Sequence, residues 1–218
     1  MAKTAPQMQA RKPKEPAMKL YYSPGACSLA SHIVLAETGA PFTIERADIR
    51  AKQTETGADF LGITPRGAVP VLELANGEIL GEGVAIMQYV ADSLTPGALP
   101  AAGTLDRARL QEMLNFVSTE VHKTYSPFFR GIEGAARDAQ IALLDSRLKL
   151  VESRLADGRE WLLGATFTPA DAYLFTVTNW STGVKHDLSA FPNLLAWRDR
   201  VAARPAVQAA MKAEGLLN

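Results

Sequence analysis

Residues 19–45 read KLYYSPGACSLASHIVLAETGAPFTIE. The run 19–22 is typical of a short strand, and the Ser-Pro-Gly sequence at 23–25 ends it. Apolar residues then recur at helical spacing from Leu29 to Ala36, and residues 41–45 again have the composition of a strand. This order of strand, helix and strand within about 30 residues predicts a βαβ unit.

A second set of strand signals follows a polar connection. Residues 68–74 and 78–80 are apolar runs, and the Asn76-Gly77 step between them is a strong hairpin signal. A helix is expected from about Gly83 to Ala91. We therefore predict a small α/β domain over residues 18–97.

The remainder of the chain has helical patterns after a Pro- and Gly-containing linker. Apolar residues follow one helix face between Leu110 and Val121, and they repeat at steps of three and four from Ile141 to Leu155. The Thr168-Pro169 step, with an acid at 171, predicts another helix start, and two more helices are expected around Arg204-Pro205. Residues 104–218 are thus predicted to form an all-helical domain, so the fold class is α/β followed by all-α.

Composition limits the function classes. The chain has 218 residues, 47% of them hydrophobic, with 23 basic and 23 acidic side chains. A zero net charge disfavours a nucleic-acid partner, and no run of about 18 apolar residues predicts a membrane span. The single cysteine cannot form an intramolecular disulfide, which suits the cytoplasm. Residues 1–17 contain three prolines and four basic side chains, and we expect a disordered extension there.

Cys27 is the first candidate for chemistry. It follows the break at 23–25 and lies where the first helix begins, and the unpaired N–H groups of a helix N-terminus favour a thiolate. A buried, inert cysteine is the alternative, and the residues alone leave both open. No C-x-x-C motif is present, so a second thiol for redox work would have to come from another molecule.

Pro70 lies at the start of a predicted strand. A cis Val69-Pro70 bond would free the backbone groups of Val69 for a peptide-like ligand. Because cis bonds are only about 5–6% of X–Pro bonds, the sequence alone favours an ordinary trans start.

Asn115, Thr119 and His122 share one face of a predicted helix. The pattern alone favours a solvated helix face. No two of the chain's histidines have the spacing of a helical zinc motif, so we expect no metal and a structural role for His32 and His186.

Six segments together resemble bacterial beta-class cytosolic glutathione S-transferases, over nearly the whole chain from residue 18 to residue 217. These segments are YYSPGACSL (21–29), GAVPVL (67–72), GEGVAI (81–86), NF (115–116), EVHK (120–123) and TPADAY (168–173). The resemblance implies a thioredoxin-like N-terminal domain, a helical C-terminal domain and a homodimer with one glutathione site per subunit. It also favours the cis form at Pro70 and gives Thr168 and Asp171 a role as a helix-capping box.

The resemblance also assigns site residues. It implies that Cys27 faces the glutathione sulfur and can form a mixed disulfide with it. Lys52 and Val69, with the neighbouring Pro70, match positions that contact the tripeptide, and Glu82 and Gly83 match the pair that holds its γ-glutamyl end. Three residues of the helical domain match positions that close the site around the sulfur: Asn115, Thr119 (commonly serine in the family) and His122.

General chemistry agrees with these assignments. Glu82 can bind the α-ammonium of glutathione, Lys52 a carboxylate, and the strand edge at Val69 a peptide bond. His122 can donate to sulfur or move a proton near neutral pH, and Tyr21, Tyr22 and Ser28 are rival hydroxyl donors.

We therefore expect a cytoplasmic glutathione transferase that conjugates glutathione to a hydrophobic electrophile and also exchanges thiols through Cys27. Two alternatives stay open: a thiol transferase or disulfide reductase, and a non-enzymatic binding scaffold of the same fold.

Overall fold

The computed structural model describes residues 18–217, and the extension expected at 1–17 lies outside them. The first part of the described chain is a mixed α/β domain. Its elements in chain order are β1 Met18–Tyr22, α1 Ser28–Thr38, β2 Phe42–Asp48, β3 Gln53–Thr54, α2 Phe60–Ile63, β4 Val71–Glu73, β5 Ile79–Gly81 and α3 Gly83–Leu94.

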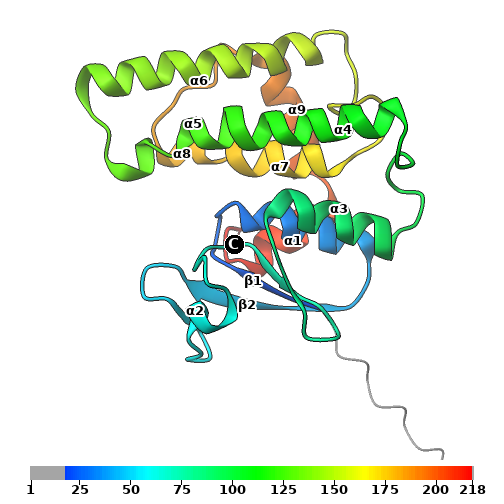
Figure 1. Cartoon of the computed structure of the whole chain (residues 1–218). Helices are drawn as coiled ribbons and strands as arrows, with labels where there is room; N and C mark the ends of the chain where they lie inside the picture. Colours follow the sequence, from blue (N-terminus) through cyan, green and yellow to red (C-terminus); the bar gives the residue numbers. More distant parts are fainter. Residues whose placement is uncertain (1–17, 218) are drawn as a thin grey trace, which may run out of the picture.

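The second part is helical throughout, and the division into a mixed and a helical part is confirmed (Figure 1). Its elements are α4 Leu105–Phe116, the π-helical turn η1 Val117–His122, α5 Lys123–Tyr125, the 3-10 turn η2 Phe128–Arg130, α6 Gly134–Leu155, α7 Pro169–Thr178, α8 Trp180–Gly183, α9 Pro192–Ala202 and α10 Pro205–Ala213.

The sheet has five strands in the order β3-β2-β1-β4-β5. Strand β1 pairs in parallel with β2, which confirms the βαβ unit, and antiparallel with β4. Strands β4 and β5 form the predicted hairpin. The polar connection predicted before the hairpin is more structured than expected, because it contains β3 and α2. Two and four residues are too few to produce a recognisable periodicity.

Helix α1 is buried along most of its length because it lies between the sheet and the helical domain (Figure 1). It packs against α3, α7 and α10. Its last turn ends at Gly39, whose left-handed φ of 67° lets its N–H donate to the carbonyl of Ala36.

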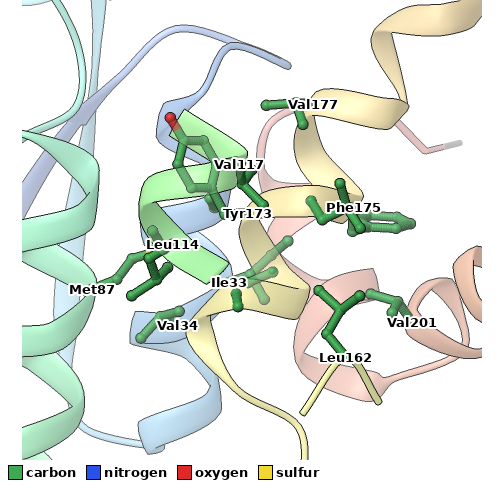
Figure 2. Close-up of a cluster of buried hydrophobic side chains, with 14 of the residues drawn as sticks. Ile33, Val34, Met87, Leu114, Val117, Leu162, Tyr173, Phe175, Val177 and Val201 are labelled. Carbon is green, nitrogen blue, oxygen red and sulfur yellow. The ribbon is translucent and has the colours of Figure 1, made fainter. Parts of the chain in front are cut away.

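Apolar side chains from both domains meet in one core (Figure 2). Ile33 of α1 and Met87 of α3 lie beside Leu114 of α4, and Phe175 of α7 belongs to the same cluster. Burial of such side chains contributes about 1.5–3 kcal/mol each. The two domains are therefore held together by shared apolar contacts.

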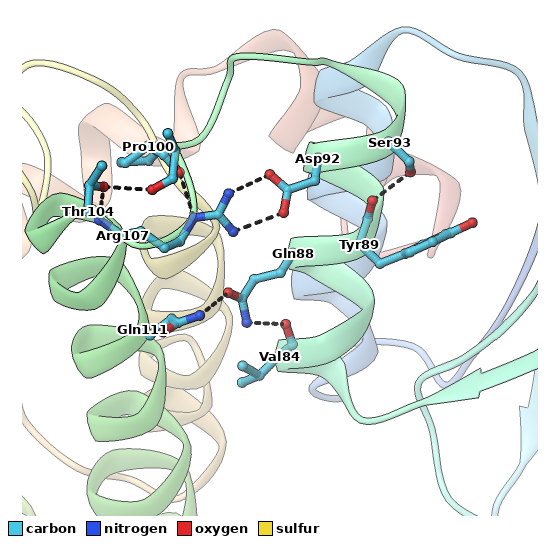
Figure 3. A network of polar contacts seen from close by, with 10 residues as sticks. Val84, Gln88, Tyr89, Asp92, Ser93, Pro100, Thr104, Arg107 and Gln111 are labelled. Atoms are coloured by element: carbon cyan, nitrogen blue, oxygen red, sulfur yellow. Dashed lines mark hydrogen bonds and ion pairs between the residues drawn. The ribbon is translucent and has the colours of Figure 1, made fainter.

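Polar contacts fix the linker between the domains (Figure 3). The Arg107 guanidinium of α4 donates to both carboxylate oxygens of Asp92 on α3, at 2.9 and 2.6 Å. Its Nε donates to the carbonyl of Pro100 at 2.6 Å. One arginine thus joins α3, the linker and α4, and such a paired fork restricts the geometry of all three.

The capping box at Thr168 is confirmed, and Pro169 occupies the first turn of α7. Oδ2 of Asp171 accepts from the backbone N–H and the hydroxyl of Thr168, at 2.9 and 2.8 Å. Oδ1 accepts from the N–H of Leu162 at 2.8 Å and from Nε1 of Trp197 at 3.1 Å. The buried carboxylate therefore joins α7 to α9 and to the preceding loop.

Candidate functional site

A cavity of about 310 Å³ lies between the two domains. Its walls come from the loop before α1, the segment leading into β4, the junction of β5 with α3, and the helices η1, α5 and α7. The lining residues are Cys27, Thr64, Arg66, Ala68, Val69, Pro70, Val71, Gly81, Glu82, Gly83, Met87, Ser118, His122, Lys123 and Tyr173. A volume of this size is at the lower end of the range for small-molecule sites.

The loop that carries Cys27 is held from the C-terminal end of the chain. The Gly25 N–H donates to Oε2 of Glu214 at 2.9 Å, and Nε1 of Trp180 donates to the Gly25 carbonyl at 2.8 Å. Gly25 has a left-handed φ of 68°, which favours glycine. Sequence motifs place Cys27 at the start of α1, but these long-range contacts set the position of its loop.

The Cys27 thiol lies in the cavity wall and donates to the carbonyl of Val69 at 3.3 Å. Burial raises the pKa of the Cys27 thiol from 9.0 to about 11, although backbone hydrogen bonds from Cys27 and Ser28 and the charge of Lys123 lower it. Of the two possibilities that the residues left open for Cys27, this raised pKa favours the protonated thiol over the thiolate. The helix N-terminus acts in the predicted direction, but desolvation is the larger effect.

The Val69–Pro70 peptide bond is cis, as the family resemblance implies. Both residues line the cavity immediately before β4. The carbonyl of Val69 is aimed at the Cys27 sulfur, so a peptide backbone laid along this segment would come close to the thiol.

Glu82 and Gly83 lie together at another part of the cavity wall. Glu82 has a left-handed φ of 66°, which is unusual for a residue with a side chain, and Gly83 begins α3. A Cβ on Gly83 would lie 3.4 Å from Cγ of Pro70, which is an ordinary van der Waals contact, so Gly83 lies directly beside Pro70. The Glu82 carboxylate forms an ion pair with Arg66.

His122 lies in the wall contributed by the helical domain, with Nδ1 2.7 Å from the Tyr173 hydroxyl. Burial, aided by the charge of Lys123, lowers the pKa of His122 from 6.5 to about 4. Of the two roles expected for His122, this lowered pKa favours hydrogen-bond donation by the neutral ring over proton transfer near pH 7. When the Tyr173 hydroxyl donates to Nδ1, Nε2–H of the neutral ring is a free donor.

Three predicted residues do not line the cavity. Asn115 and Thr119 are exposed, and the Thr119 hydroxyl donates to the Asn115 carbonyl at 3.0 Å. Ser118 and His122 of the π-helical turn η1 both line the cavity, as their i, i+4 spacing favours. The Lys52 ammonium donates to the Gly67 carbonyl at 2.8 Å, beside the lining segment.

The rival hydroxyl donors do not line the cavity either. The Tyr21 hydroxyl donates to Glu73 at 2.8 Å, and the Ser28 hydroxyl contacts the backbone of Ser23. Tyr22 is buried. Strand alternation points Tyr21 toward α2, where its ring lies 6.0 Å from that of Phe60.

No role was predicted for several of the lining residues. Tyr173 belongs to the TPADAY motif, whose other residues cap α7, and Lys123 follows His122. Ser118 belongs to none of the motifs singled out in the sequence. Arg66 lies in a turn and carries no local signal, so only its contact with Glu82 could identify it.

The other two histidines have structural partners, as predicted. Nδ1 of His32 lies 2.9 Å from Glu214, and Nε2 of His186 lies 2.8 Å from Asp145. Within residues 18–217, no group of three or more His, Cys, Asp or Glu side chains could hold a metal ion. In the same part of the chain, no helix has the length and apolar character needed to cross a membrane.

Two family models match the chain. The glutathione S-transferase N-terminal domain matches residues 25–93, and the glutathione S-transferase C-terminal domain matches residues 116–205. Glutathione S-transferase GstA of Escherichia coli O157:H7 is 45% identical over 201 residues, which cover 91% of this chain and 100% of the relative.

Solved structures agree in fold and sequence. A glutathione transferase from Methylococcus capsulatus is 51% identical, with a TM-score of 0.88 over 92% of this chain and 100% of that one. A sphingomonad glutathione S-transferase complexed with glutathione is 44% identical, with a TM-score of 0.86 over 91% of this chain and 100% of that one. The chain therefore belongs to the glutathione S-transferase family.

Proposed function

We propose that this glutathione S-transferase binds glutathione in the cavity between its domains and adds the glutathione thiolate to a hydrophobic electrophile. The observation that carries the proposal is the arrangement of the cavity wall. The Glu82 carboxylate, the backbone of Val69 and the Cys27 sulfur all belong to it, and the sulfur lies 3.3 Å from the Val69 carbonyl oxygen. The three parts match the ammonium, the peptide bonds and the thiol of the tripeptide.

The sulfur of bound glutathione would lie beside Cys27 and His122. Both groups are protonated or neutral at pH 7, so neither repels a thiolate in the cavity. An N–H of His122, and the Cys27 S–H once it leaves the Val69 carbonyl, are hydrogen-bond donors that would stabilise the glutathione thiolate as the attacking group. Lys123 adds a positive charge to the same wall. Conjugation therefore does not require ionisation of Cys27.

Thiol exchange is the second candidate activity, because the Cys27 sulfur lines the cavity. The Cys27 thiolate would attack one sulfur of oxidised glutathione, forming a Cys27–glutathione disulfide and releasing a glutathione thiolate. The raised pKa of Cys27 leaves little thiolate at pH 7. We therefore place exchange second to conjugation, and it should accelerate as the pH rises.

The assembly, class and location are also proposed. The motifs at 21–29 and 81–86 support membership of the beta class. Tyr89 of α3 and Leu61 of α2 are apolar side chains that are about half exposed in the single chain, at 41% and 46%, and a homodimer interface would cover such groups. The single cysteine supports a cytoplasmic location. Light scattering of the purified protein would test the dimer.

The activity experiment compares wild type with Cys27→Ala. Each protein is incubated with oxidised glutathione for intact-mass spectrometry, and each is assayed for conjugation of glutathione to a chromogenic aromatic electrophile. We expect a glutathione adduct on wild type alone, and conjugation that survives in the variant. Loss of all conjugation in a folded Cys27→Ala variant would contradict the proposed roles. Absence of both adduct and conjugation in wild type would favour a binding scaffold.

A further inference from the structure

Arg66 and Glu82 form an isolated ion pair at the edge of the cavity. Arg66 lies between α2 and β4, whereas Glu82 lies between β5 and α3, and both line the cavity. Their side chains are 65% and 68% exposed. Within residues 18–217, neither side chain has another hydrogen-bond partner. The pair is therefore available to exchange its internal contact for contacts with a ligand.

The backbone holds both partners in place. The Lys52 ammonium donates to the carbonyl of Gly67, the residue after Arg66. Gly67 has a φ of 54°, and a Cβ there would lie 2.8 Å from a methyl group of Leu61, so this turn is tightly packed. Glu82 has its own left-handed backbone directly before α3. The two charges are thus presented by anchored segments rather than by loose loops.

The charges of Arg66, Glu82 and the adjacent helix N-terminus indicate which ligand group would bind there. Glu82 offers an anion, Arg66 offers a cation, and the N-terminus of α3 at Gly83 adds N–H groups without a partner in the helix. An α-amino acid head group carries an ammonium and a carboxylate on one carbon atom. Its ammonium can pair with the Glu82 carboxylate, and its carboxylate can pair with the Arg66 guanidinium. Binding therefore replaces the single Arg66–Glu82 ion pair with two ion pairs to the ligand.

We propose that Arg66 binds the α-carboxylate of the γ-glutamyl residue while Glu82 binds its α-ammonium, so that Arg66 selects ligands with an intact amino acid head group. This inference rests on the proposed binding of glutathione in the cavity. The Lys52 ammonium, which donates to the Gly67 carbonyl, helps to hold the turn that carries Arg66.

The test measures dissociation constants by calorimetry for three tripeptides. The first is glutathione, the second is 4-aminobutanoyl-Cys-Gly, which lacks the α-carboxylate, and the third is glutaryl-Cys-Gly, which lacks the α-ammonium. The proteins are wild type, Arg66→Gln, Arg66→Lys and Glu82→Gln. Arg109→Gln is the matched control, because Arg109 is also an exposed arginine paired with a glutamate, and it does not line the cavity.

Arg66→Gln should weaken binding of glutathione and of the glutaryl analogue by about 5- to 10-fold. This loss of affinity lies between the contribution of an exposed ion pair and that of a buried hydrogen bond to a charged group. The same variant should leave binding of the 4-aminobutanoyl analogue unchanged. Arg66→Lys should restore part of the loss. Glu82→Gln should show the converse pattern, losing affinity for glutathione and for the 4-aminobutanoyl analogue only. The control variant should bind all three tripeptides as wild type does.

Two results would overturn the inference while leaving the proposed function intact. If Arg66→Gln lost equal affinity for glutathione and for the 4-aminobutanoyl analogue, Arg66 would affect the shape of the site without binding the α-carboxylate. Unchanged or tighter glutathione binding in that variant would mean that Arg66 is only a counter-ion that competes for Glu82. Failure of wild type to bind glutathione at all would overturn the proposed function, and the inference with it.

Discussion

Alkylation of Cys27 should become fast only well above the pH at which a free thiol ionises. The experiment varies the pH and follows the alkylation rate. The expected rate follows from the pKa of Cys27, which burial raises from 9.0 to about 11. At pH 8 a pKa near 11 leaves a thiolate fraction of about 0.001, whereas a pKa near 9 leaves about 0.1. Because the thiolate is the nucleophile, the folded protein should react about 100-fold more slowly at that pH.

The assay follows modification by iodoacetamide with intact-mass spectrometry, from about pH 7 to about pH 10. The matched control is the same protein unfolded in urea, which exposes the same thiol. In the folded protein the rate should rise about tenfold per pH unit without a plateau, and in the unfolded protein it should level off near pH 9. Lys123→Gln should raise the pKa of Cys27 further, because the Lys123 charge lowers it.

The shape of the pH profile separates ionisation from access. Steric shielding of Cys27 lowers the rate at every pH but does not move the pH at which the rate levels off. A plateau in the folded protein below about pH 9 would therefore refute the argument that desolvation controls this thiol. It would also make thiol exchange a stronger candidate than we propose.

Three further predictions concern groups around the cavity and the core. The folded pKa of His122 is about 4 against an ordinary 6.5, so only the unfolded chain takes up this proton as the pH falls through that window. Stability should therefore decrease from about pH 6.5 toward about pH 4, and urea unfolding of His122→Gln should show a weaker decrease; equal slopes would contradict the assignment. Asp171→Asn should lower the free energy of unfolding, measured by chemical denaturation, by about 2–4 kcal/mol. The buried carboxylate accepts four hydrogen bonds, and the amide that replaces it cannot accept them all. The exposed control Asp138→Asn should change the free energy of unfolding by no more than about 0.5 kcal/mol, and a loss below about 1 kcal/mol in Asp171→Asn would count against the network. Glu214→Gln should speed hydrogen exchange at the Gly25 amide by at least about tenfold, because a charged acceptor of that N–H is lost, and unchanged exchange would show that the contact does not hold the loop.

Local signals in the sequence were sufficient for most of the fold. The βαβ unit, the Asn76-Gly77 hairpin and the capping box at Thr168 each depend on residues close together in the chain. Short elements such as β3 and α2 were missed because they contain too few residues to show a period. The resemblance placed Asn115 and Thr119 in the site, whereas the neighbouring Ser118, in the π-helical turn, lines the cavity.

Sequence motifs also identified many of the residues that line the cavity. Cys27, Val69, Pro70, Glu82, Gly83 and His122 all line one cavity, although they come from separate segments of the sequence. A resemblance to known proteins can transfer positions in this way because each motif is local. It transfers neither the protonation states of those side chains nor the residues that hold them in place.

By itself the sequence determined the order of the elements, the two-domain division and the segments that meet at the cavity. Only the tertiary structure decided the chemical state of the site. The pKa of Cys27 follows from burial between two domains, and His122 meets Tyr173 across 51 residues of chain. Arg66 is identified as a candidate site residue by its ion pair with Glu82. The N–H of Gly25 donates to Glu214, which lies 189 residues further along the chain. Desolvation and charge pairing depend on every group nearby in space, whereas a sequence pattern records only the groups nearby in the chain.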